Sequence, residues 1–571
     1  MTNAQIAQIF YEMADLLDIL GVEWKPIAFR KAARVIESEP EDMETIYKKR
    51  GIKGLLELDG VGDAIAKKIV QFIEKGKVEE HEELKKQIPD GVEAMLKIPG
   101  LGPKKVARLY KGLKIDSLEK LEKLAKAEKI RKLSGFGEKS EEDILMGLEL
   151  VKKGTERKLM GMIYPYAHQI ADEVLKIKGV EKVEVAGSLR RMRETVKDMD
   201  MLVFTRTPES VAKAVQKLSE VEKVERAGDT LVSVRLKNGI SADIRMLAPE
   251  LYGSGLVHFT GSKEHGIALR NRAIKMGMKF SEYGLVKGKK IVASKTEKDV
   301  YAALGLQEVP PEMRENKGEI ELAEKKKLPA LVGYDDIRGD LHTHTSWSDG
   351  AHTTEQMLAR AVELGYEYYA ITDHSKSDYV ANGLDEKRLM QHLTEMDKLQ
   401  KKYPQIRLLK GSEVAILADG KLDYSDKILK ELDIVIGSIH SGFKNEEKKM
   451  TSRLTCALEN EFLHFIAHPT GRLINQRNPY ALNVEKILDA AKANGKAFEI
   501  NAFPSRLDFG EQPIKMCVER KIDLVINTDA HSIQNLDFMK FGIGQARRGW
   551  ATKENILNTL PWNKFAKKIP R

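Results

Sequence analysis

The sequence predicts a multidomain chain with a helical front, a mixed α+β middle and a C-terminal (β/α) barrel. Its 571 residues suffice for three or four domains at roughly 100–200 residues each. The spacing of apolar residues changes near residue 180 from helical to alternating, which indicates a change from helices to strands. From residue 335 onward, short apolar strands alternate with helical segments, and reactive side chains follow the strands, as in a (β/α) barrel.

Composition and charge exclude several classes of protein. No run of about 18 apolar residues occurs, so we expect no membrane-spanning helix, and the first residues lack the basic start of a secretory leader. Two cysteines cannot build a disulfide framework. We therefore expect a cytoplasmic protein, with a monomer as the default. Almost all of the net charge of +9 lies before residue 335, which favours a polyanionic partner.

Residues 1–88 and 89–150 are expected to form two helical domains, because their apolar side chains recur at helical spacing. Three glycine hairpins lie in this region, each with an apolar residue, a G-x-G step and a polar helix start. Their sequences are LDGVGDAIAKKI (58–69), IPGLGPKKVARLY (98–110) and LSGFGEKSEEDIL (133–145).

These hairpins resemble the helix–hairpin–helix motif, which holds DNA phosphates without reading base sequence. Glycine permits a tight turn, and the N–H groups of the helix start behind it favour an anion. The alternative is plain helix capping in an ordinary bundle. The predicted DNA-binding residues are Gly60, Gly62, Gly100, Gly102, Lys104, Lys105, Gly135 and Gly137.

The middle of the chain, at residues 151–248, places three aspartates on predicted strands. Asp198 and Asp200 in KDMD are two residues apart and face the same side of one strand, and Asp243 in SADIR comes from a neighbouring strand. Three converging carboxylates repel one another unless divalent cations neutralise them. Two such ions can activate a hydroxyl and stabilise a leaving pyrophosphate. The alternative for a D-x-D pair alone is a solvated strand.

A glycine–serine step precedes these aspartates in GSLRR. Gly187 and Ser188 can offer a backbone N–H and a hydroxyl to a triphosphate, and Arg191 adds positive charge. The whole order of G-S, D-x-D and a later strand aspartate is far more specific than D-x-D alone.

Residues 1–310 resemble the family X DNA polymerases, the family of DNA polymerase beta. The motifs GSLRR, KDMD and ADIR match the family's palm, and HFTGSKEHGIALR (258–270) matches the thumb segment that closes over the incoming nucleotide. The resemblance implies a nucleotidyltransferase palm at 151–248 and a thumb at 249–315. It also implies that the first helical domain is like the family's 8-kDa domain and the second like its fingers.

The resemblance implies a role for each matched residue. Asp198, Asp200 and Asp243 would bind two Mg²⁺ or Mn²⁺ ions for chemistry on deoxynucleoside triphosphates. Two departures affect the choice of sugar and base, because His258 stands where the family has a tyrosine and Gly266 where it has an asparagine. The implied nucleotide-binding residues are Gly187, Ser188, Arg191, Phe259, Gly261, Ser262 and, on the template side, Arg270.

The same resemblance implies a catalytic role for Lys68. In the family, a lysine at this place in the first hairpin forms a Schiff base with an abasic-site sugar, and Lys25 matches a basic residue of the same pocket. Phe29 and Ala64 depart from the pattern, since they replace a tyrosine and a lysine. A lysine nucleophile is often activated by neighbouring cations. The alternative for Lys68 is a contact with a DNA phosphate.

The C-terminal part carries most of the 13 histidines, and several lie at strand ends beside acids. In DLHTHTSWSDG, His342 and His344 are two residues apart and share one face of a predicted strand. A mixture of imidazole and carboxylate suits Zn²⁺, Mn²⁺ or Fe, and the number of candidates calls for two or three ions. The alternative is scattered structural histidine. The candidate ligands are His342, His344, Asp349, His374, Glu413, His440, His468, Asp529 and His531.

Residues 335–571 resemble the polymerase-and-histidinol-phosphatase (PHP) family, and all nine ligand positions of its trinuclear site are filled in order. The resemblance implies a distorted seven-stranded (β/α) barrel that hydrolyses phosphate esters with the help of metal. Arg506 is either a phosphate contact or part of a structural salt bridge. The two cysteines match no ligand position and are expected in the core. The charged segment 316–334 is expected to be a linker.

The order of polymerase and then PHP is that of bacterial and archaeal family X polymerases. There the PHP domain is associated with Mn²⁺-dependent 3′–5′ exonuclease activity and with processing of blocked 3′ ends and abasic sites. We therefore expect a DNA-directed DNA polymerase that fills short gaps in base excision repair, binds gapped or primer–template DNA independently of sequence, and trims 3′ ends. The first alternative is a small-molecule phosphatase of the histidinol phosphatase type that is docked on DNA. The second is a scaffold that binds gaps without catalysis.

Overall fold

A computed structural model describes residues 3–39, 41–58, 60–98, 101–152 and 157–569. The chain divides into two compact units. The first comprises residues 1–156 with 475–478, and the second comprises residues 157–474 with 479–571. No helix within the described ranges is long and apolar enough to cross a bilayer.

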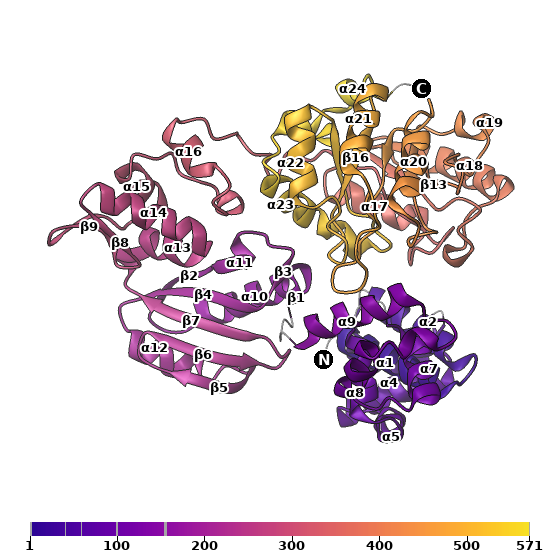
Figure 1. Ribbon diagram of the computed structural model, residues 1–571, viewed down its shortest axis with the longest axis horizontal. Coiled ribbons are helices and arrows are strands. Elements are labelled where there is room, and N and C mark those ends of the chain that lie inside the picture. Colours follow the sequence, from indigo (N-terminus) through magenta and orange to yellow (C-terminus); the bar gives the residue numbers. More distant parts are fainter. Residues whose placement is uncertain (1–2, 40, 59, 99–100, 153–156, 570–571) are drawn as a thin grey trace. The chain divides into compact units, whose positions relative to one another are not determined.

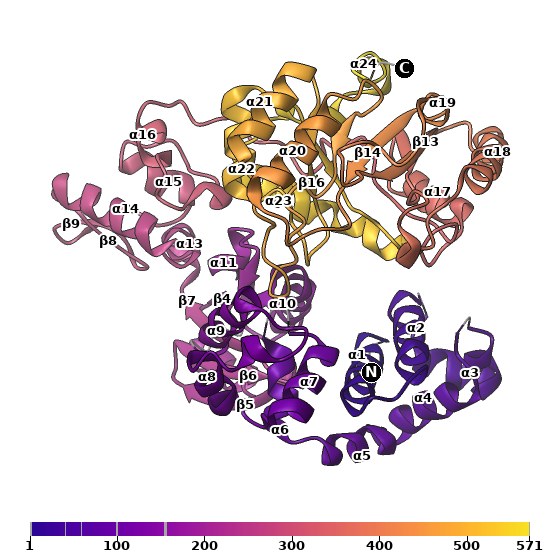
Figure 2. The ribbon, with the colours of Figure 1, turned by 45° about the vertical axis from the view of Figure 1, so that its right-hand side comes forward.

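The first unit is helical, as the sequence predicts (Figure 1). Helices α1 and α2 pack together (Figure 2), and Ile6, Phe10 and Met13 of α1 are buried in the core of this unit. The helices are α1 (Asn3–Leu20), α2 (Lys25–Ser38), α3 (Met43–Leu56), α4 (Asp63–Lys75), α5 (Glu79–Gln87), α6 (Asp90–Ala94), α7 (Pro103–Leu113), α8 (Leu118–Lys126) and α9 (Glu138–Lys152), with the 3₁₀ turns η1 (Met95–Lys97) and η2 (Ile130–Lys132).

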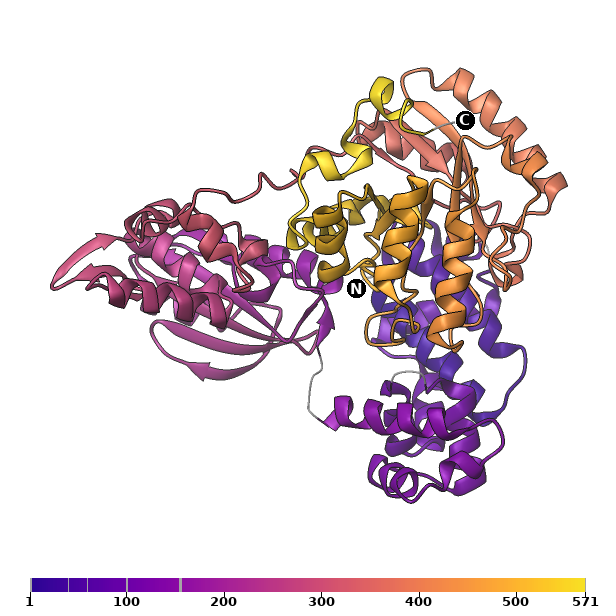
Figure 3. The same ribbon diagram turned by 45° about the horizontal axis from the view of Figure 1, so that its top comes forward.

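The second unit begins with a five-stranded sheet in the order β2-β4-β7-β6-β5, in which only β4 and β7 run parallel. Its strands appear in magenta in Figure 3. The sheet agrees with the alternating pattern that begins near residue 180 and with the strands predicted for Asp198, Asp200 and Asp243. The elements are β1 (Lys158–Leu159), α10 (Met160–Leu175), β2 (Val180–Val185), α11 (Gly187–Arg190), β3 (Thr195–Val196), β4 (Asp198–Thr205), α12 (Pro208–Val215), β5 (Val221–Ala227), β6 (Leu231–Leu236) and β7 (Ser241–Leu247).

A small helical and hairpin layer follows, with its own apolar core and a three-stranded antiparallel sheet. Its elements are η3 (Pro249–Leu251), α13 (Tyr252–Thr260), α14 (Lys263–Lys275), β8 (Lys279–Ser281), β9 (Gly284–Lys287), β10 (Lys290–Ala293), α15 (Glu297–Ala303) and η4 (Pro311–Met313).

The segment 316–334, expected to be a linker, is packed against its neighbours. It contains helix α16 (Glu319–Glu324), whose Glu319 is fully buried and lies 2.7 Å from Nδ1 of His265. Tyr301 lies 2.9 Å from the other ring nitrogen of His265. Although the segment is rich in charged residues, the Glu319 carboxylate points inward and joins the segment to helix α14.

The C-terminal part forms a parallel seven-stranded barrel in the sequential order β11 to β17. The ladder between the first and last strands is reduced to a bridge of Thr343 with Ala530, which makes the barrel distorted. Helices lie around these strands (Figures 1 and 2). The strands are β11 (Gly339–Asp340), β12 (Tyr368–Ile371), β13 (Arg407–Ala415), β14 (Ile434–Ser438), β15 (Phe465–Ile466), β16 (Ala497–Asn501) and β17 (Leu524–Asn527).

The helices of the barrel carry its outer apolar core. They are α17 (Thr354–Glu363), α18 (Glu386–Lys402), α19 (Asp426–Leu429), α20 (Glu447–Leu458), α21 (Val484–Asn494), α22 (Glu511–Arg520), α23 (Met539–Arg548) and α24 (Trp562–Phe565), with the 3₁₀ turns η5 (Tyr379–Ala381), η6 (Ile533–Phe538), η7 (Lys553–Asn555) and η8 (Leu557–Thr559).

Two side chains of the barrel extend into the apolar core of the five-stranded sheet. Leu507 and Phe541 of the barrel are buried among the residues of the sheet layer. Gly161 and Gly544 permit close approach, because a Cβ on Gly161 would lie 2.5 Å from Pro504 and one on Gly544 would lie 2.6 Å from Met192. The two layers are therefore fitted to each other at van der Waals distance.

The two cysteines differ in environment, which corrects the expectation that both lie in the core. Cys456 is exposed and Cys517 is buried. Burial raises the pKa of the Cys517 thiol to about 12, since the thiolate is poorly solvated there. Cys456 faces solvent because it lies on the outer side of helix α20, whereas Met450 and Leu454 of that helix are buried.

We expect Ellman's reagent to modify Cys456 rapidly in the native protein and Cys517 only after unfolding, because the thiolate is the reactive form. Absorbance of released thionitrobenzoate, measured with and without guanidinium chloride, checks this. A Cys456→Ser variant should lose the fast phase alone. Fast release from both thiols in native buffer would contradict the burial of Cys517.

Candidate functional site

Strands β4 and β7 bring the three predicted aspartates together. The parallel register pairs Asp200 with Asp243, and Asp198 begins β4 two residues earlier. The Ser233 hydroxyl donates a hydrogen bond of 2.6 Å to Asp243 and holds its carboxylate. Gly187 has a φ of +59°, and a Cβ there would lie 2.1 Å from Oδ2 of Asp200. Only glycine therefore fits against this carboxylate.

These carboxylates disturb one another. Burial, together with the charges of Asp198 and Asp243, raises the pKa of Asp200 to about 6. Arg245 and Arg191 act in the opposite direction without cancelling the effect. Divalent cations bound between the carboxylates would remove this repulsion, so the donor set fits hard metal ions.

A cleft of about 730 Å³ opens beside the aspartates, between α11 and the start of α14. The side chain of Ser262 caps α14 by accepting a hydrogen bond of 3.3 Å from the His265 N–H. All the predicted nucleotide-binding residues line this cleft together with Asp198 and Asp200. They are Gly187, Ser188, Arg191, Phe259, Gly261, Ser262 and Arg270.

Arg191 lines the cleft but is already engaged. Its Nε lies 3.1 Å from Glu315, and Nη1 donates to the carbonyl of Thr260. Arg548 from the barrel donates to the Arg191 carbonyl at 2.8 Å and to Glu315 at 3.0 Å. Sequence inspection missed Glu315 and Arg548, because no local pattern marks a pairing across 124 and 357 residues.

The two departures from the polymerase pattern also lie at this cleft. His258 and Gly266 both line it. A Cβ at Gly266 would contact nothing within 4 Å, so this corner is open space. Burial lowers the pKa of His258, whose Nε2 lies 3.8 Å from Glu282.

Lys68 lies in a small charged cluster of the first unit. Its ammonium is 2.8 Å from Glu80, and the Lys25 ammonium is 3.5 Å from the same residue. The ring of Phe29 lies below Lys68, with 5.8 Å from Nζ to the ring centroid. Nucleophilic lysines are activated by desolvation or by neighbouring cations, and here the nearest charge is a carboxylate. This geometry favours a structural or phosphate-binding role for Lys68.

The glycine hairpins lie at helix starts, as predicted. Gly62 and Gly102 are the N-caps of α4 and α7, and Gly137 directly precedes α9. Gly60 and Gly135 have φ values of +78° and +85°, a conformation that favours glycine. Lys104 and Lys105 belong to the first turn of α7. Gly100 lies outside the described residues.

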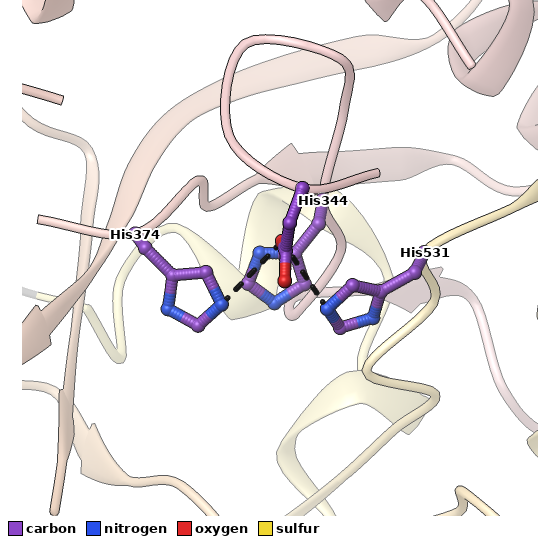
Figure 4. Close-up of side chains that lie close together, drawn as sticks. His344, His374 and His531 are labelled. Atoms are coloured by element: carbon purple, nitrogen blue, oxygen red, sulfur yellow. Dashed lines mark ion pairs between the residues drawn. The ribbon is translucent and has the colours of Figure 1, made fainter. Parts of the chain in front are cut away.

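The nine predicted ligands of the barrel converge in four overlapping groups, within each of which the ligand atoms lie within 4.8 Å of one another. Figure 4 shows His344 between His374 and His531, and the ring centroids of these neighbours are 4.4 and 4.2 Å from that of His344. The groups are His344, Asp349, His374 and His531; His342, Glu413 and His468; His342, His344 and Asp529; and His374, Glu413 and His440.

The barrel explains this convergence, because the carboxyl ends of parallel strands meet at one rim. His440 and His468 lie two residues beyond β14 and β15, and Asp529 lies two residues beyond β17. His342 and His344 follow β11, which ends at Asp340; the prediction that both lie within a strand is therefore wrong. Thr343 keeps this stretch extended through its bridge to Ala530, so the two rings still share one side.

Buried atoms without hydrogen-bond partners test whether metal fits this site. Among the described residues they include Nε2 of His342, both ring nitrogens of His344 and Oε2 of Glu413. Orphaned buried polar atoms are costly, and here they face one another. Metal ions would satisfy these atoms at once, so the donor set fits divalent metal.

The charges around these rings differ from one to the next. Burial, with the neighbouring rings of His531 and His374, lowers the pKa of His344 to about 4, so that its imidazole is neutral at pH 7. Burial alone would lower the pKa of His440, but Glu413 and Asp378 raise it to about 9. Asp349 likewise raises the pKa of His531 to about 9 against the effect of burial.

Supporting acids complete the site, and sequence inspection missed them. Glu499 lies 2.7 Å from Nδ1 of His342, and Asp378 lies 2.7 Å from Nδ1 of His440. Such partners fix the orientation of a ligating imidazole. The signal for Glu499 was its position between the apolar residues Phe498 and Ile500 of strand β16. Arg506 pairs with Asp529 at 3.2 Å, which agrees with the salt-bridge alternative.

Comparison with protein families matches four parts of the chain. Residues 1–78 match a helix-hairpin-helix domain and residues 92–149 a SAM-like helix-hairpin-helix tandem. Residues 255–315 match the DNA polymerase beta thumb, and residues 340–503 match the PHP domain.

Comparison with individual proteins gives a relative along nearly the whole chain. The chain is 39% identical over 563 residues to the DNA polymerase/3′-5′ exonuclease PolX of Bacillus subtilis (strain 168), which covers 98% of this chain and 97% of the relative. Probable phosphatases of Thermoanaerobacter sp. (strain X514) and Acetivibrio thermocellus are 29% and 30% identical. Each covers 38% of this chain, in the PHP part, and the alignments cover 89% and 86% of the phosphatases.

Proposed function

The chain belongs to the family X DNA polymerases that carry a C-terminal PHP domain, and we propose that it fills short gaps during DNA repair and trims 3′ ends itself. The observation that carries the proposal is the presence of two separate metal-binding constellations in one chain. One is the aspartate group of the palm beside a nucleotide-sized cleft, and the other is the nine-ligand group of the barrel.

At the palm, Asp198, Asp200 and Asp243 hold two Mg²⁺ or Mn²⁺ ions. Such ions favour deprotonation of the primer 3′-hydroxyl and neutralise charge on the phosphates. Gly187 and Ser188, which begin α11 and line the cleft, bind the triphosphate of a deoxynucleotide. The primer hydroxyl then attacks the α-phosphate and pyrophosphate leaves.

At the barrel, the nine ligands hold two or three ions of Zn²⁺, Mn²⁺ or Fe. Metal there supplies a nucleophile at neutral pH and charge neutralisation for phosphodiester hydrolysis. Glu499 and Asp378 keep the rings of His342 and His440 oriented toward the site. The substrate is the last phosphodiester of a DNA 3′ end, including blocked ends and abasic sites.

The helical front holds DNA by its phosphates. Gly62 and Gly102 present helix starts, and Lys104 adds positive charge. Lys68 also contacts phosphate. Binding is therefore independent of base sequence and sensitive to salt.

The protein acts as a monomer in the cytoplasm.

A second candidate function follows from the similarity of the PHP part to probable phosphatases. In that case the barrel hydrolyses a small phosphate monoester while the front docks the protein on DNA. Release of inorganic phosphate from histidinol phosphate, without shortening of DNA, would favour this candidate.

The decisive assay uses a 5′-labelled primer at a one-nucleotide gap with Mn²⁺, with and without deoxynucleotides. We expect extension when deoxynucleotides are present and shortening when they are absent. Extension without shortening would support the polymerase activity, contradict the exonuclease activity and favour the phosphatase alternative for the PHP domain. Absence of both reactions would contradict the proposed function.

A further inference from the structure

Two exposed apolar side chains lie on the short loop between the ligand His374 and helix α18. Tyr379 is 87% exposed and Val380 is 98% exposed. Among the described residues from 335 onward, the other large apolar side chains counted as exposed are Met390 at 40% and Leu417 at 36%. The loop therefore presents apolar surface far beyond what this domain shows elsewhere.

The loop is fixed to the metal-ligand group at both ends. At its start, Asp378 lies 2.7 Å from Nδ1 of His440 and 3.7 Å from Nδ1 of His374. At its end, the Asn382 amide donates to the carbonyl of Ser348 at 3.1 Å, and Ser348 is the neighbour of the ligand Asp349. Residues between these two anchors consequently form part of the rim of the site.

The exposure of Tyr379 and Val380 belongs to an ordered conformation. The loop forms the 3₁₀ turn η5. Its third residue, Ala381, is buried with 7% of its surface exposed, so the turn packs against the domain on that side. The Arg388 guanidinium donates to the carbonyls of Asn382 at 3.0 Å and Gly383 at 3.1 Å. These contacts support the turn on which Tyr379 is exposed, directly after Asp378 in the chain.

We propose that Tyr379, supported by Val380, is a nucleobase-binding subsite that stacks on the terminal base of a DNA 3′ end during hydrolysis. The inference rests on the proposed exonuclease function. An aromatic face accepts every base, so it suits an enzyme that trims ends irrespective of sequence. A small phosphate monoester has no base to stack, so the subsite would distinguish a nucleic-acid end from such a substrate.

The test compares two 5′-labelled single strands that differ only at the 3′ terminus. One ends in a normal nucleotide and the other in a tetrahydrofuran abasic residue, and both are incubated with Mn²⁺. Removal of the normal nucleotide by the wild-type protein should be faster than removal of the abasic residue. Tyr379→Ala should slow removal of the normal nucleotide by about tenfold and leave the abasic end unchanged, in keeping with the usual contribution of base–aromatic stacking.

Matched variants separate stacking from a structural role. Tyr379→Phe should retain wild-type rates because it keeps the aromatic face, and Met390→Ala removes an exposed apolar side chain elsewhere on the same domain without effect. Equal rates for wild type and Tyr379→Ala on both strands, or an equal loss on both, would overturn the inference. A wild-type protein that shortens neither strand would instead contradict the proposed exonuclease function and, with it, the subsite.

Discussion

Replacing Asp200 with asparagine is expected to reduce primer extension by at least about a thousand-fold while 3′–5′ exonuclease activity persists. Asp200 pairs with Asp243 on the neighbouring strand and lies two residues after Asp198, and its Oδ2 lies against Gly187. Asparagine keeps the shape but removes a negative ligand. Metal clamps on transferred phosphoryl groups supply several kcal/mol, and each 1.36 kcal/mol is a factor of ten in rate. Gap-filling of a labelled primer measures the loss.

The same variant should fold at least as well as the wild type without metal. The pKa of Asp200 is raised to about 6 by burial and by its two neighbours, so its charged form destabilises the metal-free fold at neutral pH. Its removal should leave the thermal midpoint in EDTA unchanged or higher.

Asp229→Asn gives a matched control, since Asp229 is exposed and lies outside the cleft in the turn after β5. This control should extend the primer like the wild type. Persistent extension by Asp200→Asn would remove the palm aspartates from the reaction. Loss of both activities in a folded Asp200→Asn protein would contradict two independent centres.

Local sequence pattern predicts the parts of the sites that local geometry determines. Asp198 and Asp200 alternate along one strand, and His440 and His468 each follow an apolar strand, so period and position suffice to bring them to one face or one rim. A resemblance to known families then adds the roles of the residues. Both centres could therefore be predicted before the fold was known.

Pairings between distant residues could not be predicted in this way. Glu80 beside Lys68 and Glu319 beside His265 stand in strongly charged stretches, where every glutamate looks solvated. The exposed side of Cys456 depends on which face helix α20 turns to the barrel. Tertiary packing determines these pairings and this exposure, and the local sequence around each residue contains no signal for them.

Contacts between palm and barrel show how far this tertiary packing reaches. Arg472 lies 2.7 Å from Glu194, and the Gln545 amide donates to the Met192 carbonyl at 2.9 Å. Because Arg548 also donates to the Arg191 carbonyl, the barrel supports the segment that borders the cleft beside the palm aspartates. A barrel variant that unfolds locally could thus weaken extension indirectly, which makes conservative substitutions essential in separating the two activities.

Replacing His344 with alanine should reduce exonuclease activity by about a hundred-fold or more and leave primer extension within a few-fold of the wild type. His344 is fully buried and belongs to two of the four ligand groups, and its Nε2 lies 3.2 Å from the Asp529 carboxylate without a hydrogen bond of good geometry. Loss of a residue that two ion positions share should weaken metal binding at both positions. Mutation of a residue that only supports a metal ligand already costs roughly 10–100-fold in affinity or activity, and loss of the ligand itself should cost at least as much. Shortening of a 5′-labelled strand with Mn²⁺ measures the effect.

His392→Ala gives the matched control, because His392 is also buried in the barrel but stacks on Trp347 and contacts Thr354 outside the ligand groups. Both variants remove an imidazole from the core and should lower the thermal midpoint, yet only His344→Ala should lose exonuclease activity and bound metal, measured by elemental analysis. Equal losses in the two variants would assign the effect to stability. Unimpaired trimming by His344→Ala would show that the 3′ end is not cut at the barrel centre. Two of the four candidate metal-binding groups among the described residues contain His344 and would be incomplete in this variant.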